Sequence, residues 1–325
     1  MRSFLKKILL YSTIVMAIFI AYELALLRVP NEYSYKKGYI EQHKNELEVL
    51  ILGNSHLADC IDASLLEKTA FNAAQPGRSA HYDLELIKEY ISQLPKLECF
   101  ILPFSYDYMY WGHHHETEPN PNFNTFRCMY FKYMGYSYEK CDILYWSEIL
   151  NSNLDHMARL RDANKPPLSR ITLCDSLGLT IDAGLATRKK DWKQLGLRGT
   201  TPLPDSTELY LNREDNIKIY SEIASIMRQH HKRLILVAPP IYKTERERVG
   251  QQQIDEMNDF VKMMQRINSD IEFYNLIDAP GFGDDDFYNA IHVNNTNGAR
   301  KITAILNNII NNPPRQALNN NKVIN

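Results

Sequence analysis

Short apolar runs and amphipathic stretches alternate along two parts of the chain, up to residue 105 and from residue 213 onward. Runs rich in aliphatic residues and bounded by turn residues are typical of buried strands; they cover 47–52, 69–74, 99–103, 233–238 and 271–277. Apolar residues spaced three and four positions apart predict helices; these cover 84–91, 213–230, 251–267 and 297–311. Strands separated by helices predict βαβ units, so we expect an α/β fold with a mainly parallel five-stranded sheet.

The N-terminal segment follows a different pattern. An apolar run extends from Ile8 to Leu27 and contains one charged residue, Glu23. At 1.5 Å per residue this run is long enough to span the roughly 30 Å hydrocarbon layer of a membrane. Basic residues precede the run, and no small-residue cleavage site follows it. We predict an uncleaved signal anchor over residues 1–30, a single transmembrane helix of the inner membrane, with the body facing the periplasm or exterior.

Three further segments lack the strand–helix rhythm. Residues 31–46 are polar and predict a juxtamembrane linker, and the Asn-rich tail over 312–325 predicts disorder. Residues 106–212 mix aromatic, proline and asparagine stretches, with a helix expected over 139–161, and we interpret them as a helical and loop insertion. The main domain is therefore expected to comprise residues 47–311.

Composition narrows the classes of function. Apolar residues make up 44% and charged residues 23% of the chain, a globular profile, and the net charge of −2 gives no reason to expect nucleic acid as a partner. The five cysteines form no CxxC pair, and we expect mostly buried thiols. Adjacent histidines point in different directions, so His113-His114-His115 predicts a solvated loop. No P-loop or GxGxxG motif is present, and we predict neither a metal nor a cofactor.

Candidate chemistry lies where the predicted strands end. The carboxyl ends of parallel strands meet at one edge of a sheet, so Ser55, Gly77 and Ser105 should gather with the loop after the last strand. Ser55 lies on a strand-to-helix turn, and a serine becomes nucleophilic when a base removes its proton. His292, in the loop before the last helix, is the candidate base. The plainer alternatives are a helix-capping serine and a structural histidine, and we expect His56 to point away.

Three blocks of the sequence resemble the SGNH/GDSL hydrolase superfamily. Gly53-Asn54-Ser55 resembles the first block, with asparagine where the family usually has aspartate. Asn72 to Gly77 resembles the second block, whose glycine contributes an oxyanion-hole N–H. Phe287 to Ala299 resembles the last block, which carries the histidine. The resemblance covers 47–105 and 215–310 and leaves the middle of the chain unmatched.

The resemblance implies a flavodoxin-like three-layer α/β/α fold and a serine esterase or O-acyltransferase. The backbone N–H groups of Ser55 and Gly77 would hold the oxyanion of such an enzyme. The layout of anchor and domain is similar to that of membrane-anchored bacterial envelope proteins, which include the teichoic-acid D-alanylation protein and alginate-type O-acetyltransferases. It therefore implies an acylated cell-envelope glycan, or another acyl ester, as the substrate.

Two departures from the family pattern bear on activity. The triad acid, three residues before the histidine, is Asn289 here, an amide that can orient the imidazole but cannot stabilise imidazolium as a carboxylate does. One of Asp284-Asp285-Asp286 is an alternative orienting group. The third block, Gly-x-Asn-Asp in the family, is replaced by Leu102-Pro-Phe-Ser105. Ser105 is accordingly a candidate oxyanion donor or a plain strand-end cap.

These departures leave three hypotheses open. In the first, Ser55, His292 and Asn289 form the catalytic machinery of an esterase or acyltransferase. In the second, the same fold is catalytically weakened or inactive and binds a glycan or an envelope partner. In the third, the protein is structural, and the segment 106–212 mediates assembly.

Overall fold

The structure is a computed structural model that describes residues 1–112, 127–135, 143–151, 174–199 and 207–313. The chain divides into two units: Met1–Tyr39 with Glu116–Thr172, and Ile40–His115 with Leu173–Asn325. The tract 113–115 and the residues of the tail from 314 onward lie outside the described residues. Of the helix expected over 139–161, the described part contains α6 (Ile143–Trp146).

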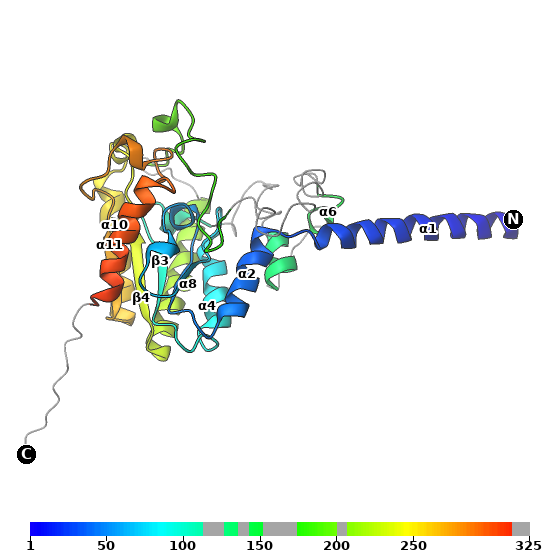
Figure 1. Cartoon of the computed structure of the whole chain (residues 1–325), viewed down its shortest axis with the longest axis horizontal. Coiled ribbons are helices and arrows are strands. Elements are labelled where there is room, and N and C mark those ends of the chain that lie inside the picture. Colours follow the sequence, from blue (N-terminus) through cyan, green and yellow to red (C-terminus); the bar gives the residue numbers. More distant parts are fainter. Residues whose placement is uncertain (113–126, 136–142, 152–173, 200–206, 314–325) are drawn as a thin grey trace, which may run out of the picture. The chain divides into compact units, whose positions relative to one another are not determined.

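Five parallel strands form the sheet of the second unit, as predicted (Figure 1). They are β1 (Val49–Ile51), β2 (Ala70–Asn72), β3 (Cys99–Pro103), β4 (Arg233–Ala238) and β5 (Ile271–Asn275). Their spatial order is β2-β1-β3-β4-β5, so the chain runs outward from β1 to one edge and then returns to build the other side. The switch point between β1 and β3 is where doubly wound sheets bind ligands, at the carboxyl ends of the strands.

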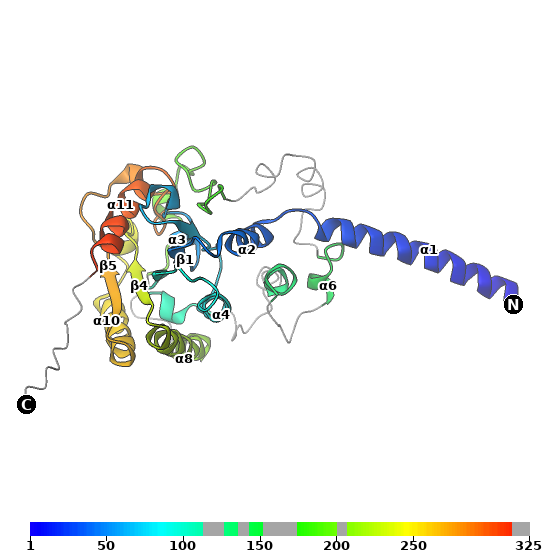
Figure 2. The same cartoon turned by 60° about the horizontal axis from the view of Figure 1, so that its bottom comes forward.

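Helices cover both faces of this sheet, which confirms the predicted three layers (Figure 2). One face carries α4 (Ala80–Tyr90), α8 (Thr207–His230) and α10 (Gln251–Ile267), and the other carries α3 (Ser55–Ala58) and α11 (Asn297–Asn311). Alternate strand residues turn to opposite faces, because side chains in a strand have a period of two. The core on the α11 side includes Ile51, Ile101, Ile235, Ile302 and Leu306.

Shorter elements connect this framework. The remaining described helices are α2 (Glu32–His43), α9 (Lys243–Arg246), the 3₁₀ turns Ala63–Leu65, Tyr108–Tyr110, Trp192–Gln194 and Asp284–Asp286, and a π-helical turn at Tyr130–Met134. Helix α2 lies in the segment 31–46, where the sequence predicted a linker. The segment is helical although it is polar, because Glu32 and Lys36 form an ion pair of 2.6 Å one turn apart and both side chains are buried.

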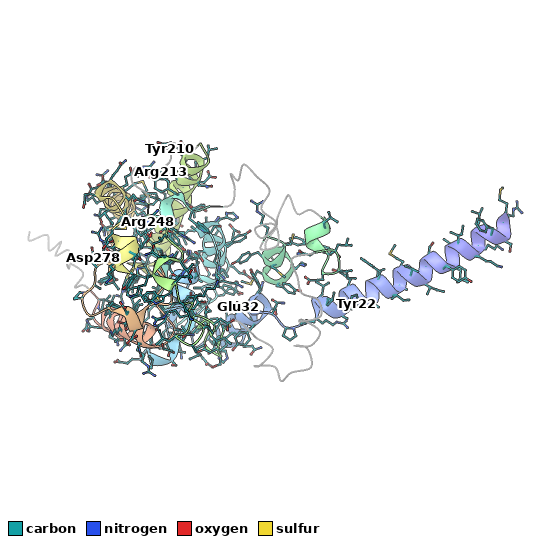
Figure 3. All side chains as sticks on the ribbon, turned by 90° about the horizontal axis from the view of Figure 1, so that it is seen from above. Tyr22, Glu32, Tyr210, Arg213, Arg248 and Asp278 are labelled. Atoms are coloured by element: carbon teal, nitrogen blue, oxygen red, sulfur yellow. The ribbon has the colours of Figure 1, made fainter. Side chains whose placement is uncertain are left out.

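The N-terminal helix α1 (Arg2–Leu27) differs from the other helices in composition and exposure. Its best 18-residue window has a mean hydropathy of 2.0, and only 6% of that window is buried. Most of its apolar side chains are exposed, as Figure 3 shows along the helix. By length and composition α1 could therefore cross a membrane.

Cysteine chemistry differs in part from the expectation. Cys60, Cys99 and Cys174 are buried and form no disulfide, as predicted. Burial raises the pKa of Cys99 to about 12, so its thiol stays protonated and unreactive at neutral pH. Cys128, in contrast, is disulfide-bonded.

We predict that Gly53→Ala lowers the free energy of unfolding by roughly 2–4 kcal/mol. Gly53 follows β1 with φ +107, a conformation that L side chains rarely adopt, and an added Cβ would lie 2.2 Å from Cδ of Pro103. Gly38→Ala is the matched control, because a Cβ there meets nothing within 4 Å and alanine favours the surrounding helix. Urea unfolding of both variants tests this, and equal stabilities would contradict it.

Candidate active site

The turn after β1 positions Ser55. Asn54 precedes α3 in extended conformation, and its Oδ1 accepts a hydrogen bond of 2.9 Å from the N–H of His56. The helix cap is therefore Asn54, not Ser55. The hydroxyl of Ser55 is left for another partner, which argues against the simple capping serine considered from the sequence.

A buried ion pair fixes the backbone beneath this turn. Asp83 Oδ1 accepts a hydrogen bond of 2.9 Å from the N–H of Gly53 and lies 3.4 Å from Nη1 of Arg78, and both side chains are fully buried. Burial raises the pKa of Asp83 to about 6, although Arg78 and the Gly53 N–H oppose this shift. The N–H of Gln75 donates to the carbonyl of Gly53 at 2.8 Å. The loop that contains Gly77 is thus tied directly to the turn that contains Ser55.

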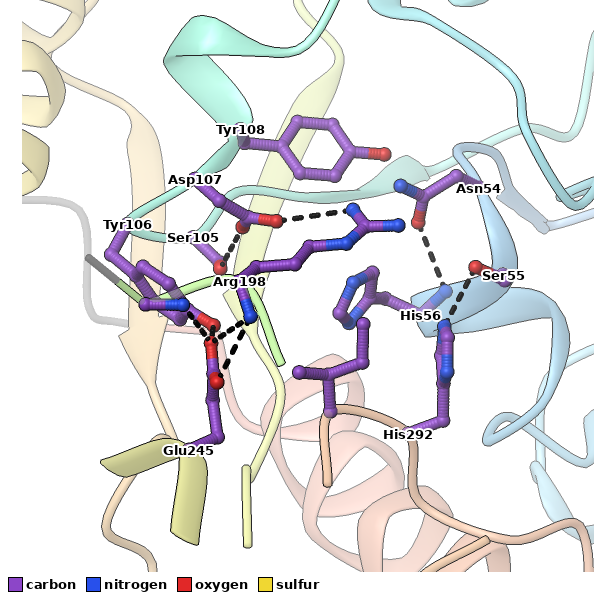
Figure 4. Close-up of polar contacts among 12 residues, drawn as sticks. Asn54, Ser55, His56, Ser105, Tyr106, Asp107, Tyr108, Arg198, Glu245 and His292 are labelled. Atoms are coloured by element: carbon purple, nitrogen blue, oxygen red, sulfur yellow. Dashed lines mark hydrogen bonds and ion pairs between the residues drawn. The ribbon is translucent and has the colours of Figure 1, made fainter. Parts of the chain in front are cut away.

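The structure brings His292 to Ser55. Oγ of Ser55 lies 2.8 Å from Nε2 of His292, although 237 positions separate the two residues along the chain (Figure 4). Both residues are half-buried. The loop that carries His292 is closed by a bridge between Phe287 and Val293, and it packs on the start of α11. Gly298 permits that packing, because a Cβ there would lie 2.1 Å from Cγ1 of Val293.

Asn289 fixes the tautomer of His292. Oδ1 of Asn289 accepts backbone hydrogen bonds from Ile291 (3.0 Å) and His292 (2.9 Å), and backbone N–H groups can only donate. The atom facing Nδ1 of His292, at 3.1 Å, must therefore be the amide oxygen rather than the amide nitrogen. Nδ1 then carries the proton, and Nε2 presents a lone pair to the hydroxyl of Ser55. This is the tautomer that a general base requires.

Electrostatics keep this imidazole neutral. Burial lowers the pKa of His292 well below its usual value, the neighbouring His56 and Arg198 lower it further, and Asp107 partly opposes them. Asn289 adds no charge to counter the effect. The free imidazole is therefore ready to accept a proton, but the imidazolium that would form is poorly stabilised.

His56 does not point away, which corrects the prediction from the sequence. Its ring lies against that of His292, with centroids 4.7 Å apart, because α3 begins so close to the loop of His292. Its Nε2 is buried and finds no hydrogen-bond partner within the described part of the chain. Burial, with a smaller contribution from Arg198, lowers the pKa of His56 to about 3.

Because His56 is buried in its neutral form, we predict that the free energy of unfolding depends on pH. The folded pKa of His56 lies below the unfolded value of 6.5, so its contribution is fully present above pH 6.5 and is lost as the pH falls toward about 3. One proton changes the free energy of unfolding by up to about 1.4 kcal/mol per pH unit in this window. His56→Phe keeps the ring contact and should remove that part of the slope. Urea unfolding at about pH 7 and about pH 5 measures it, and an unchanged slope would contradict the assignment.

A second polar group lies just after β3 and includes Ser105, Asp107 and Arg198. Oγ of Ser105 donates its single hydrogen to Oδ1 of Asp107 at 2.8 Å, so this geometry does not offer it to an oxyanion. Oδ2 of Asp107 lies 3.3 Å from Nη1 of Arg198. Arg198 could not be identified from the sequence, because it lies in the irregular segment before α8, where neither spacing nor motif distinguishes one arginine from another.

The three consecutive aspartates do not replace Asn289 as the orienting group. Asp284 lies 2.5 Å from Nζ of Lys193 and accepts a hydrogen bond of 2.7 Å from Tyr242. The pKa of Asp284 is lowered, chiefly by Lys193. Asp286 is paired with Lys301 at 2.7 Å. Among the residues that the structure describes, no three His, Cys, Asp or Glu side chains gather where they could hold a metal ion.

Comparison with known proteins adds little to this geometry. No protein-family model matches the chain, and no curated protein matches it. Among solved structures, the chain is similar to a protein from Streptococcus pneumonia that is provisionally described as a platelet activating factor. The two are 11% identical, the match covers 91% of this chain and 98% of that chain, and the TM-score is 0.38. At this distance the likeness carries no argument, and the site rests on its own contacts.

Proposed function

We propose that this chain is a serine esterase or O-acyltransferase of the SGNH/GDSL type. The observation that carries the proposal is the contact of 2.8 Å between Oγ of Ser55 and Nε2 of His292, in the tautomer that Asn289 imposes. A hydroxyl bonded to an unprotonated imidazole is the minimal apparatus for nucleophilic acyl transfer.

In the proposed mechanism, Oγ of Ser55 attacks the carbonyl carbon of an ester while Nε2 of His292 takes its proton. The N–H groups of Ser55 and Gly77 are the candidate oxyanion donors. His292 returns the proton to the leaving alcohol, which leaves an acyl group on Ser55. Water or a second hydroxyl then releases the acyl group by the reverse steps, so hydrolysis and transfer share one intermediate.

Three features support a location at the cell envelope. Helix α1 is long and apolar enough to cross a membrane, and basic residues precede it, which favours an N-terminus inside the cell. The disulfide at Cys128 is typical of an oxidising compartment, outside the cytoplasm. We infer a single-pass anchor in the inner membrane and an acyl or acetyl ester of an envelope glycan as the substrate.

Labelling with a fluorophosphonate probe tests the nucleophile. The full chain in detergent should form a covalent adduct, because an activated serine attacks phosphorus as it attacks a carbonyl. Ser55→Ala should lose the adduct, and Ser64→Ala, which removes an exposed serine whose hydroxyl donates to Asp62, is the control. If the wild type labels no more than Ser55→Ala, the proposed nucleophile is wrong.

Asn289 favours a second candidate function. A neutral amide leaves the imidazolium without a counter-charge, and the third family block is replaced, so the same fold could bind an envelope glycan without turnover. Acetyl-ester hydrolysis by the wild type that is lost in His292→Ala would exclude this alternative. Glycan binding that Ser55→Ala leaves intact, with no hydrolysis by the wild type, would support it.

A further inference from the structure

Arg198 extends into the candidate active site from outside the matched blocks. Figure 4 shows its guanidinium between Asp107 and Asn54, beside the ring of His56. Its charge also lowers the pKa of both His56 and His292, in addition to the larger effect of burial. The side chain is 32% exposed, so a ligand at Ser55 can approach it.

The surrounding residues hold Arg198 in this position. Both oxygens of the buried Glu245 accept hydrogen bonds from the backbone N–H of Arg198, at 3.1 and 3.0 Å. The guanidinium lies 4.6 Å from the ring centroid of Trp111, a cation–π contact. Asp107 then fixes one end of the guanidinium by accepting a hydrogen bond from its Nη1. Such a preorganised side chain loses little conformational entropy when it binds a ligand.

Among the residues that the structure describes, most of the donors of this guanidinium have no partner. Arginine carries five N–H donors, and within the described part of the chain Asp107 is the hydrogen-bond partner of the guanidinium. Asp107 also accepts the hydroxyl of Ser105, which spreads its charge over two contacts. The donors that face Asn54 lie on the side of the nucleophile (Figure 4). The parallel N–H donors of a guanidinium match the spacing of two oxygens of a carboxylate or phosphate.

We propose that Arg198 binds an oxyanion group, a carboxylate or a phosphate, on the molecule whose acyl ester reacts at Ser55. This inference rests on the proposed function and names its substrate class as an acyl ester that carries a negative charge close to the ester. A neutral acyl ester would leave the arginine donors unpaired in a half-buried site, and would bind less tightly.

Three acetyl esters that differ mainly in charge test the proposal. The carboxylate of 4-acetoxybenzoate is absent from its methyl ester, and 4-acetoxyphenyl phosphate replaces it by a phosphate. Arg198→Gln should lower kcat/KM for the charged esters by about 10- to 100-fold, chiefly through KM, and for the methyl ester by no more than about 3-fold. The relative rates of the two charged esters show which oxyanion the site prefers.

Arg228→Gln is the matched control, because it removes the same charge at the C-terminal end of α8, which precedes β4 and so lies at the opposite edge of the sheet. Equal losses on charged and neutral esters would overturn the proposal and assign Arg198 to the transition state instead. If Arg198→Gln lowers kcat/KM for neither the charged nor the neutral esters, the proposal is also overturned.

Binding of an unreactive analogue separates this proposal from the proposed function. Calorimetry with 4-acetamidobenzoate, whose amide replaces the ester, should show about 10-fold weaker binding to Arg198→Gln than to the wild type. If the wild type hydrolyses no ester but shows this difference, the arginine site stands and the esterase fails. If it hydrolyses esters and binds the analogue equally well with and without Arg198, the esterase stands and the arginine site fails.

A separate observation concerns the first unit, where Glu23 lies within the apolar helix α1. Its carboxylate accepts hydrogen bonds from Oγ of Ser147 (2.8 Å) and from the backbone N–H groups of Glu148 (2.6 Å) and Ile149 (3.1 Å). A carboxylate in a membrane helix is costly unless it is paired or hydrogen-bonded. These contacts satisfy Glu23 and place the turn 147–149 beside α1, about 6 Å along the helix from its end at Leu27.

Apolar side chains flank that turn and face outward. Leu144 is 53% exposed, Trp146 is 38% exposed and Leu150 is 45% exposed. Because the turn between them is bound at the level of Glu23, these side chains lie near the depth at which α1 would leave the bilayer. Tryptophan is enriched at that depth, where its ring meets both lipid and water.

We infer that Trp146, at the end of α6, and the apolar side chains on either side of the turn 147–149 insert into the lipid interface beside α1 and form a second contact with the membrane. Placed in nanodiscs whose lipids carry bromine in the upper acyl chain, the full chain should show tryptophan quenching that Trp146→Phe removes. Trp192→Phe is the control, because Trp192 is buried against Tyr242. Quenching that is the same in the wild type and Trp146→Phe would overturn the inference.

Discussion

His292→Ala is expected to lower kcat/KM for an acetyl ester by about 10²- to 10⁴-fold, which is less than in a complete triad because Asn289 already lacks the charge of the acid. In the structure, Nε2 of His292 is the acceptor within 2.8 Å of Oγ of Ser55, and its proton is held on the far nitrogen by Asn289. Without this imidazole, Ser55 would have to lose its proton to water, and its hydroxyl is a poor nucleophile at neutral pH. Initial rates on 4-nitrophenyl acetate, with the full chain in detergent, give the measurement.

The control for this loss is His230→Ala, which removes an exposed histidine at the end of α8. It should leave the rate within about twofold of the wild type, since substitutions of exposed residues away from the active site and the core have small effects. If His292→Ala keeps more than a tenth of the wild-type rate while Ser55→Ala does not, another base serves Ser55. His56 would be the candidate, because its ring lies next to that of His292.

The sheet and the meeting of Ser55 with His292 could be predicted from the sequence because they depend on topology. Each predicted strand overlaps a strand in the structure, and the carboxyl ends of parallel strands must share one edge. A residue that follows β1 and a residue in the loop before α11 are then brought together by the sheet, whatever the intervening segment does.

The environment of that pair could not be predicted in the same way. Arg198 reaches the site because the buried Glu245, on α9, binds its backbone, and no local pattern connects those two positions. His56 looked like an ordinary helix residue, because its contact with His292 depends on the exact pitch of the short helix α3. Helix α2 was not predicted because Glu32 and Lys36 are charged residues, which a sequence pattern assigns to the surface, whereas in the structure they are buried as an ion pair.

Asn289→Asp is expected to raise kcat/KM by roughly 10²- to 10⁴-fold, the reverse of the loss seen when a triad aspartate becomes an amide. A carboxylate oxygen can accept the same three hydrogen bonds that Oδ1 of Asn289 now accepts. The two backbone donors among them favour the ionised form of the new aspartate. Its charge would then stabilise the imidazolium of His292 as Ser55 attacks.

The pH–rate profile checks the physical cause as well as the size of the effect. The wild-type pKa of His292 lies below 6.5, so its activity should persist into acid, with the acid limb of kcat/KM below pH 6.5. A negative charge at position 289 raises the pKa of His292, so the acid limb of Asn289→Asp should move to higher pH while the plateau rises. A plateau that rises without such a move would indicate altered geometry rather than added charge.

Asn289→Ala completes the series, because it removes both the amide and the acceptor of two backbone N–H groups. It should lower activity and also lower the free energy of unfolding, by about 1–3 kcal/mol for the unsatisfied donors. Asn289 thus has a structural role that is independent of charge, because its amide oxygen holds the backbone of the loop that carries His292. If Asn289→Asp gains no activity although His292 keeps its contact with Ser55, the missing charge is not what limits the site, and the binding function becomes the better explanation of this fold.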